Sequence, residues 1–293
     1  MEVQWYPGHM VKAKQLIQEN LKLVDLVIEL VDARIPASSR NPDLERLVGN
    51  KPRMLIMNKE DLADPIKTGA WCNYFKRQGL PTVVVNSLIG SGLRQVSTTA
   101  NHLAEEKMRA LMAKGRRPRA VRVMVVGIPN VGKSAFINAL TGRSVTQTGD
   151  KPGVTRGKQW IRLSDDLELL DTPGILWPKF DDPEVGFKLA VTGAVSDLVY
   201  DVEEVGLQLI DLLSRIAPQA ILERYRLAEV KEDPRETLLE IGRRRGFLQT
   251  GGVVDSVKSA YLILQEFREG KMGRITLDDV PKIEPAIYNP EEY

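Results

Sequence analysis

Cysteine is nearly absent from this sequence, and long apolar runs are missing altogether. The single cysteine, Cys72, among 293 residues excludes a disulfide framework and a zinc ribbon, because both need several thiols. No stretch approaches the roughly 20 apolar residues that a membrane-spanning helix needs. Residues 1–7 also lack the basic segment followed by an apolar one that is typical of a secretion signal. These absences predict a soluble, cytoplasmic protein with no membrane partner.

The net charge is only +2, but the two parts of the chain differ strongly in charge. Residues 181–293 hold 14 Lys/Arg and 22 Asp/Glu, a balance of −8, which leaves +10 for residues 1–180. A basic stripe in the first part is either a contact for RNA phosphates or a solvated helix end and linker. The stripe consists of Lys107, Arg109, Lys114, Arg116, Arg117, Arg119 and Arg122.

Apolar segments that alternate with helical patterns predict an α/β fold in the first part of the chain. Nearly continuous apolar runs ending at polar motifs are typical of buried parallel strands, and such sheets bind ligands at the carboxyl ends of their strands. We therefore expect a doubly wound, mostly parallel sheet. The expected strands are 26–31, 53–57, 82–85, 121–126, 159–163 and 167–170, and the expected helices are 10–23, 65–78, 92–112 and 135–140.

From residue 183 onward the pattern becomes helical throughout. Gly and Pro signals separate the helical stretches, and no convincing strand pattern is found. We therefore predict a first domain at 1–178 and an all-α second domain at 183–293. The expected helices of the second domain are 184–195, 202–216, 219–226, 234–246 and 255–269.

Residues 127–134, Gly-Ile-Pro-Asn-Val-Gly-Lys-Ser, stand between an expected strand and an expected helix. Backbone N–H groups of such a phosphate loop point at phosphate oxygens, and the helix adds its positive end. Lys133 is expected to bridge the β- and γ-phosphates as a catalytic residue, and the Ser134 hydroxyl to bind Mg²⁺. The other expected phosphate-site residues are Asn130, Val131, Gly132 and Ala135.

The motif Asn58-Lys59-Glu60-Asp61 follows another expected strand and suits a guanine base. The Asp61 carboxylate can accept two hydrogen bonds from guanine N1–H and its N2 amino group, while the stem of Lys59 packs along the ring. Asn86 and Ser87 end the next strand, where they either supply a backbone N–H to guanine O6 or form a plain turn. GTP or GDP is therefore the expected ligand, held at the base by Asn58, Lys59, Glu60, Asp61, Asn86 and Ser87.

A third motif, Asp171-Thr172-Pro173-Gly174, also ends a strand. Asp171 is expected to hold Mg²⁺ through water, and Gly174 to present its N–H to the γ-phosphate. Thr155, in a Gly-containing loop between this motif and the phosphate loop, is the candidate for a second hydroxyl on Mg²⁺. We count it among the catalytic residues.

The order of the three motifs is permuted, because ordinary GTPases have the phosphate loop first and Asn-Lys-x-Asp last. Four further segments match a known family closely. With these motifs, the sequence resembles the circularly permuted P-loop GTPases, and specifically the bacterial ribosome-biogenesis GTPase A (YlqF-like) family, over nearly the whole chain. The segments are Trp5–Met10, Asp32–Pro36, the extension of the third motif to Lys179, and Ala190–Ala194.

This resemblance implies a Mg²⁺-dependent GTPase that is slow alone and stimulated by ribosomal particles. It implies binding to a late precursor of the large (50S) ribosomal subunit, contact of the helical domain with 23S-type rRNA, and hydrolysis that times release; we expect a monomer. Two alternatives stay open. One is an RNA-binding module that uses GTP only as a structural ligand, and the other is a GTPase acting on tRNA or translation factors.

The resemblance also bears on catalysis. Ile175 stands where Ras-like proteins have a water-orienting glutamine, and an alkyl group cannot orient water. His9, one of only two histidines, matches a family position proposed to replace that glutamine; alternatively, it only caps a helix. Asn130 resembles the phosphate-loop asparagine of potassium-activated GTPases, which implies K⁺ between the phosphates. Ala135 departs from the family's usual hydroxyl residue, which removes a contact to the α-phosphate.

Overall fold

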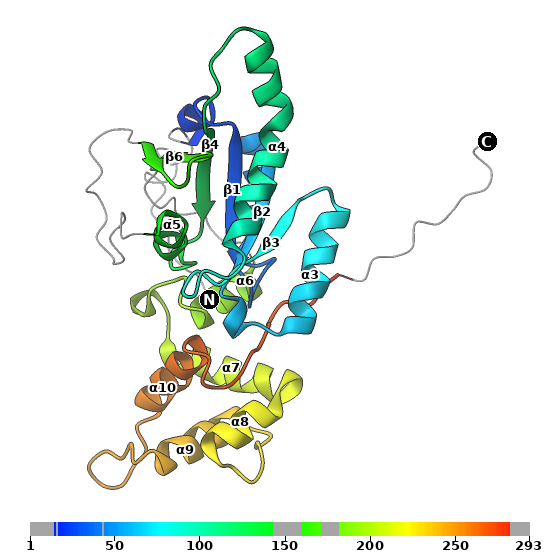
Figure 1. Ribbon diagram of the computed structural model, residues 1–293. Coiled ribbons are helices and arrows are strands. Elements are labelled where there is room, and N and C mark those ends of the chain that lie inside the picture. Colours follow the sequence, from blue (N-terminus) through cyan, green and yellow to red (C-terminus); the bar gives the residue numbers. More distant parts are fainter. Residues whose placement is uncertain (1–14, 16, 43, 143–159, 171–181, 282–293) are drawn as a thin grey trace, which may run out of the picture.

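A single six-stranded sheet forms the centre of the computed structural model, which describes residues 15, 17–42, 44–142, 160–170 and 182–281. The strand order is β3-β2-β1-β4-β6-β5, and every neighbouring pair is parallel except β5 with β6. This confirms the predicted α/β fold with a mostly parallel sheet (Figure 1). The strands are β1 (Leu26–Asp32), β2 (Arg53–Asn58), β3 (Thr82–Val84), β4 (Val121–Gly127), β5 (Trp160–Arg162) and β6 (Leu167–Leu170).

Helices cover both faces of this sheet. In β2, Leu55 belongs to the apolar cluster beneath α3 (Pro65–Arg77), whereas Ile56 lies in the core cluster that includes the apolar side of α4 (Leu93–Ala113). Because successive strand residues point to opposite faces, α3 and α4 lie on opposite faces. The chain crosses from β3 back to β4, so the strand order reverses between β1 and β4, where ligands bind in such sheets. Shorter helices are α2 (Leu44–Val48), η1 (Glu60–Leu62) and α5 (Lys133–Thr141).

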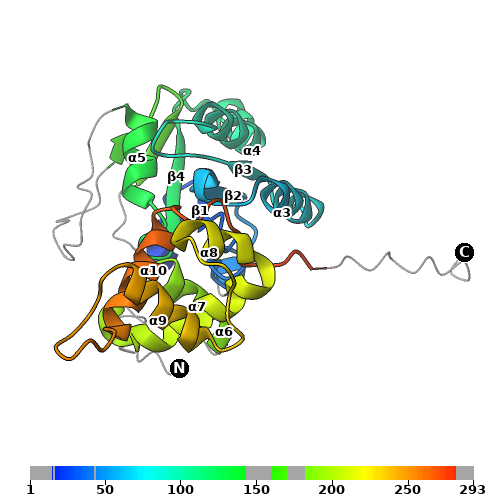
Figure 2. The ribbon, with the colours of Figure 1, turned by 90° about the horizontal axis from the view of Figure 1, so that it is seen from below.

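The chain from residue 182 is helical, as predicted, and packs against the carboxyl-end side of the sheet (Figures 1 and 2). An isolated bridge between Leu248 and Val254 is the single β pairing among the described residues of this part. The first helix ends earlier than predicted, at Val191, because Gly193 adopts the left-handed conformation (φ 76°) that terminates helices. The helices are α6 (Pro183–Val191), η2 (Asp197–Val199), α7 (Val202–Ile216), α8 (Pro218–Tyr225), α9 (Pro234–Arg244) and α10 (Ser256–Arg268).

Aspartate residues cap the N-termini of most of the longer helices in this part of the chain. The Asp201 carboxylate accepts hydrogen bonds from the N–H groups of Glu203 and Glu204 at the start of α7, at 2.9 and 3.1 Å. Such caps satisfy N–H groups that have no partner inside the helix and stabilise it by about 1 kcal/mol each. The equivalent caps of α6, α9 and α10 are Asp182, Asp233 and Asp255.

After α10 the chain returns to the sheet, which the sequence did not predict. Residues 274–279, the C-terminal strap, lie along the loops that follow β1 and β2. Leu277 N–H donates to the Arg34 carbonyl at 2.8 Å, and the buried Asp278 carboxylate accepts from the N–H and hydroxyl of Ser38. The strap therefore joins the end of the helical part to the nucleotide-binding edge of the sheet.

Within the described ranges, no single helix is long and apolar enough to cross a membrane. α7 and α8 reach that length and composition only when taken together, and they meet at a bend of 113°.

Candidate functional site

The phosphate loop connects β4 to α5 at the carboxyl edge of the sheet. Gly132 has φ 97°, and a Cβ on it would lie 2.4 Å from Asn58 Nδ2. A Cβ on Gly127 would lie 2.6 Å from the Leu30 carbonyl oxygen. Both glycines are therefore required by close packing against β1 and the end of β2, and α5 begins immediately at Lys133 with its N–H end at the loop.

Lys133 lies across this loop, with its ammonium held by backbone carbonyls. Its Nζ donates to the Gly127 and Ile128 carbonyl oxygens at 2.7 and 2.8 Å. Burial disfavours the charged form and lowers the pKa of Lys133 to about 8. A bound phosphate group would stabilise the charged form of Lys133. The electrostatics of the site therefore fit an anionic phosphate ligand.

The guanine motif begins with a turn at Lys59, which is left-handed (φ 62°). Its Nζ lies 2.9 Å from the buried Asp32 carboxylate and donates to the Asn130 carbonyl oxygen at 2.7 Å. Lys59 thus joins the guanine motif to the phosphate loop. Asp61 is exposed, and among the described residues its carboxylate accepts no hydrogen bond. That carboxylate is consequently available to a base, and Glu60 lies beside it in η1.

Asn58 is buried next to the phosphate loop and is 2% exposed. Its Nδ2 donates to the Val131 carbonyl oxygen at 2.9 Å, and its Oδ1 accepts from the N–H and hydroxyl of Ser87 at 3.3 and 2.7 Å. Asn58 therefore ties the phosphate loop to the loop after β3. Asn86 accepts from Leu88 N–H at 2.9 Å, so it forms a turn stabilised by its own side chain.

For Asn86 and Ser87, the structure thus shows the turn, with the Ser87 N–H directed at Asn58. Their predicted donation to guanine O6 stays a prediction. Directly after them in the chain, Leu88 and Ile89 are 81% and 78% exposed. Sequence reasoning missed these two, although two adjacent apolar residues in a loop are an available signal.

Asp32 and Arg34 form a buried ion pair beside the guanine motif, and sequence reasoning did not assign them a role. The Arg34 guanidinium donates to both carboxylate oxygens of Asp32, from Nε at 3.0 Å and from Nη2 at 2.7 Å. Burial acts to raise the pKa of Asp32, but the charges of Arg34 and Lys59 outweigh it and hold that pKa below its usual range. The signal was available, because Asp-Ala-Arg directly ends a buried strand.

Two contacts join this site to the turn that follows α6. The Asn130 Nδ2 donates to the Gly193 carbonyl oxygen at 2.9 Å, and Arg34 Nη2 donates to the Thr192 carbonyl oxygen at 3.3 Å. Asn130 has a left-handed backbone conformation (φ 55°), and its side-chain amide reaches the turn after α6. The turn that follows α6 therefore contacts both the phosphate loop and the Asp32 network.

Other predicted site residues lie outside the described residues: His9, Thr155, Asp171 and Gly174. Ser134 and Ala135 occupy the first turn of α5, where a helix N-terminus favours phosphate. No group of three or more His, Cys, Asp or Glu side chains in the described part of the chain could hold a metal ion.

A phosphate loop and a guanine motif on neighbouring loops of a mostly parallel sheet define a P-loop GTPase domain, here with a permuted motif order. The model of the family described as 50S ribosome-binding GTPase matches residues 122–240. Ribosome biogenesis GTPase A of Priestia megaterium is 48% identical over 288 residues, which cover 98% of this chain and 100% of that one.

Solved structures agree with the sequence comparison. The GDP-bound structure of TM YlqF has a TM-score of 0.66 at 26% identity and covers 90% of this chain and 98% of its own. GNP-bound YlqF from T. maritima has a TM-score of 0.64 at 28% identity and covers 92% and 100%. The chain belongs to the ribosome biogenesis GTPase A family. It binds GTP and GDP and hydrolyses GTP to GDP and phosphate.

Proposed function

We propose that this GTPase is an assembly factor that binds a late precursor of the large (50S) ribosomal subunit. GTP hydrolysis then times maturation of the particle and release of the factor. The name of the relatives, ribosome biogenesis GTPase A, and the family description, 50S ribosome-binding GTPase, support this partner. We place the factor in the cytoplasm as a monomer.

The observation that carries the proposal is the direct contact between the phosphate loop and the helical part. Asn130 donates to Gly193, and Arg34 joins the guanine-motif network to Thr192. A change at the γ-phosphate would shift the loop and therefore the turn after α6. Particle binding by the helices can in this way depend on the bound nucleotide, which is the coupling that timed release requires.

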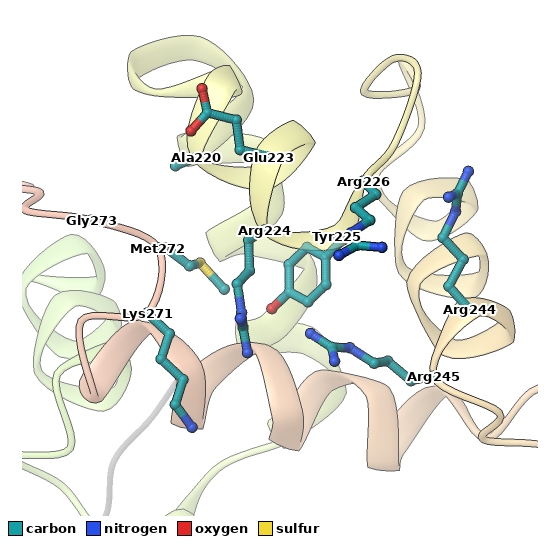
Figure 3. A pocket seen from close by; sticks show the side chains of 10 residues that line it. All are labelled: Ala220, Glu223, Arg224, Tyr225, Arg226, Arg244, Arg245, Lys271, Met272 and Gly273. Carbon is teal, nitrogen blue, oxygen red and sulfur yellow. The ribbon is translucent and has the colours of Figure 1, made fainter.

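We assign residues 1–178 to the GTPase domain and 183–293 to a helical domain that contacts 23S-type rRNA. A cavity of about 750 Å³ between α8, α9 and the end of α10 supports the RNA contact, because half of its lining residues are basic. Figure 3 shows the side chains of Arg224 and Arg245 on either side of Tyr225, with the Glu223 carboxylate pointing away. The remaining basic lining residues are Arg226, Arg244 and Lys271.

The proposed metal ligands are Ser134, Thr155 and Asp171 for Mg²⁺, which would neutralise charge on the β- and γ-phosphates when bound. Ser134 is well placed at the start of α5, beside Lys133, whose low pKa marks a site that an anion would stabilise. Gly174 would donate its N–H to the γ-phosphate. We place the base against Asp61.

Two proposed roles concern the rate of hydrolysis. Asn130 would offer its Oδ1 to K⁺, because its Nδ2 is already engaged with Gly193. His9 would orient the attacking water in place of the missing glutamine at Ile175. Without a particle to order these groups, turnover should be slow, on the order of 10⁻⁴ to 10⁻² s⁻¹.

Cosedimentation and turnover together test this function. The full chain with a GTP analogue should sediment with large-subunit precursors and not with small subunits or tRNA, and the same precursors should stimulate GTP hydrolysis. Sedimentation with tRNA alone would contradict the proposal in favour of a translation-factor role. Binding to precursors without any stimulation would instead indicate that GTP is a structural ligand of an RNA-binding protein.

A further inference from the structure

A second basic surface lies at the end of the sheet opposite the helical part. α4 ends there, and the connection from Ala113 to β4 runs over the amino-terminal ends of the strands, far from α7 to α10 (Figure 1). We call it the α4-end surface. It consists of Lys51, Lys107, Arg109, Lys114, Arg116, Arg117 and Arg119.

A single buried carboxylate organises the base of this surface. Asp25 is 1% exposed and accepts from Lys107 at 2.7 Å and from the Arg119 guanidinium at 2.6 and 3.0 Å. Burial acts to raise the pKa of Asp25, but hydrogen bonds from Arg119 and Lys107 outweigh it and lower that pKa to about 2. The carboxylate is therefore always charged, and it fixes the two cations in place.

Several Lys and Arg side chains lie close together around this single carboxylate. Lys51 reaches the Val24 carbonyl oxygen at 2.6 Å, and its pKa is lowered first by burial and then by the nearby charge of Lys107. The second of these causes is repulsion between the charges of Lys51 and Lys107, which Asp25 partly offsets. An anion at the surface would remove that repulsion.

Three further cations extend the surface toward solvent. Lys114, Arg116 and Arg117 are exposed, and no acidic partner is found for them among the described residues. By contrast, Arg109 is paired with Glu105. The charge excess at the α4 end is thus greatest in the segment Lys114–Arg117.

The cavity in the helical part has a smaller excess. Arg224 and Arg245 share Glu266, Arg244 is paired with Glu240 at 3.1 Å, and Lys271 is paired with Glu269 at 2.6 Å. Of the basic lining residues, Arg226 is left without an acidic partner among the described residues. Charge alone would therefore attract a polyanion more strongly to the α4 end than to the cavity.

We propose that the α4-end surface binds the phosphodiester backbone of ribosomal RNA, so that the GTPase domain has an RNA contact of its own. The identity of this RNA rests on the proposed function. Arginine forks match phosphate geometry, and the segment Lys114–Arg117 offers two of them without competing acids. The factor would then hold RNA at both ends, and the nucleotide site would lie between the two contacts.

A lipid surface fits this region less well. Interfacial membrane binding needs an exposed apolar face beside the charges, whereas the apolar side of α4 (Val96, Ala100 and Ala104) is buried against the sheet. Of α4's large apolar side chains, Met112 is the one more than 40% exposed.

The test uses the double variant Arg116→Glu/Arg117→Glu in the full chain. Its matched control, Lys76→Glu/Arg77→Glu, makes the same change of charge at the exposed end of α3, on the opposite face of the sheet. Binding to a large-subunit rRNA fragment and to precursor particles is measured over a range of sodium chloride concentrations. GDP affinity, measured in parallel, reports on folding and should not change, because the nucleotide site lies at the other edge of the sheet.

Loss of two phosphate contacts should make the slope of log K against log[salt] shallower by about two and weaken binding at 0.1 M salt about 10- to 100-fold. The control should match the wild type. Unchanged slope and affinity in the Arg116/Arg117 variant, or equal losses in the control, would overturn the inference. The inference would also be overturned if the Arg116/Arg117 variant lost binding to anionic vesicles but kept RNA binding. If the wild type instead bound the rRNA fragment with the expected salt dependence but failed to bind precursor particles, that result would contradict the proposed function and support RNA binding by the α4-end surface.

Discussion

The side-chain amide of Asn130, in the phosphate loop, donates a 2.9 Å hydrogen bond to the carbonyl oxygen of Gly193, in the turn after α6. Gly193 can occupy this turn because its φ of 76° suits glycine, and an added Cβ would lie 3.2 Å from the Arg268 guanidinium. The loop expected to surround the phosphates and the turn after α6, the first helix of the helical part, are therefore in direct contact.

Asn130 variants should separate the two roles assigned to that side chain. Asn130→Ala removes both the donor to Gly193 and the proposed potassium ligand, so turnover should no longer be faster in KCl than in NaCl. Asn130→Asp keeps an oxygen for the cation and should retain the potassium effect. Turnover of both variants in the two salts checks this, and potassium stimulation that survives in Asn130→Ala would exclude the proposed role.

Base selection should depend on Asp61. Asp61→Asn turns one hydrogen-bond acceptor into a donor that faces the donors of guanine, so the preference for GTP should be lost. Xanthosine nucleotides should bind instead, because their O2 can accept a hydrogen bond from the new amide. Titration of the variant with GTP and XTP measures this preference. Retained discrimination in favour of GTP would show that Asp61 does not read the base.

Nucleotide affinity should depend on pH through Lys133. Its pKa is about 8 in the free protein because burial disfavours the ammonium, and bound phosphates favour the ammonium and so raise that pKa. Affinity for GDP should be nearly constant below pH 8 and fall above it, by up to about tenfold per pH unit. Titrations between pH 7 and 9 measure this change.

Lys133→Arg provides the comparison, because guanidinium stays charged over the whole range. If this variant binds GDP at all, its affinity should not share the decline. The same decline in both proteins would place the titrating group elsewhere.

Strands and motifs could be predicted from the sequence because each is encoded locally. β1 and β2 are nearly continuous apolar runs that stop at Asp32 and Asn58, and their observed bounds differ from the predicted ones by a single residue at the carboxyl end. The short β3 ends one residue early, at Val84, where the backbone turns toward Asn86.

Roles that depend on contacts between distant segments could not be predicted. The prediction that Asn58 helps to hold the base stays a prediction, but the pattern Asn-Lys-x-Asp gave no indication that its amide also joins Val131 to Ser87. The C-terminal strap could not be predicted either, because Leu277 and Asp278 make their contacts with Arg34 and Ser38, more than 200 positions away in the sequence.

The buried pair of Asp32 and Arg34 should be important for stability. Among the described residues, Arg34→Ala leaves Lys59 as the one cation paired with the buried Asp32 carboxylate, which should lower the free energy of unfolding by about 3 kcal/mol. Arg215→Ala, which breaks an exposed pair with Asp211, should cost at most about 1 kcal/mol. Urea denaturation of the two variants gives both values, and equal losses would contradict the account of the Asp32 network.

The most direct test of the central claim compares the affinity of one large-subunit precursor for the GDP form and for the GTP-analogue form of the full chain, at one fixed salt concentration. The contacts of Asn130 and Arg34 with the turn after α6 predict that the analogue form binds more tightly, by about 5- to 150-fold. By linkage, the particle should raise the affinity for the analogue by the same factor. Equal affinity of the particle for the two forms would show that nucleotide state does not reach the helical domain.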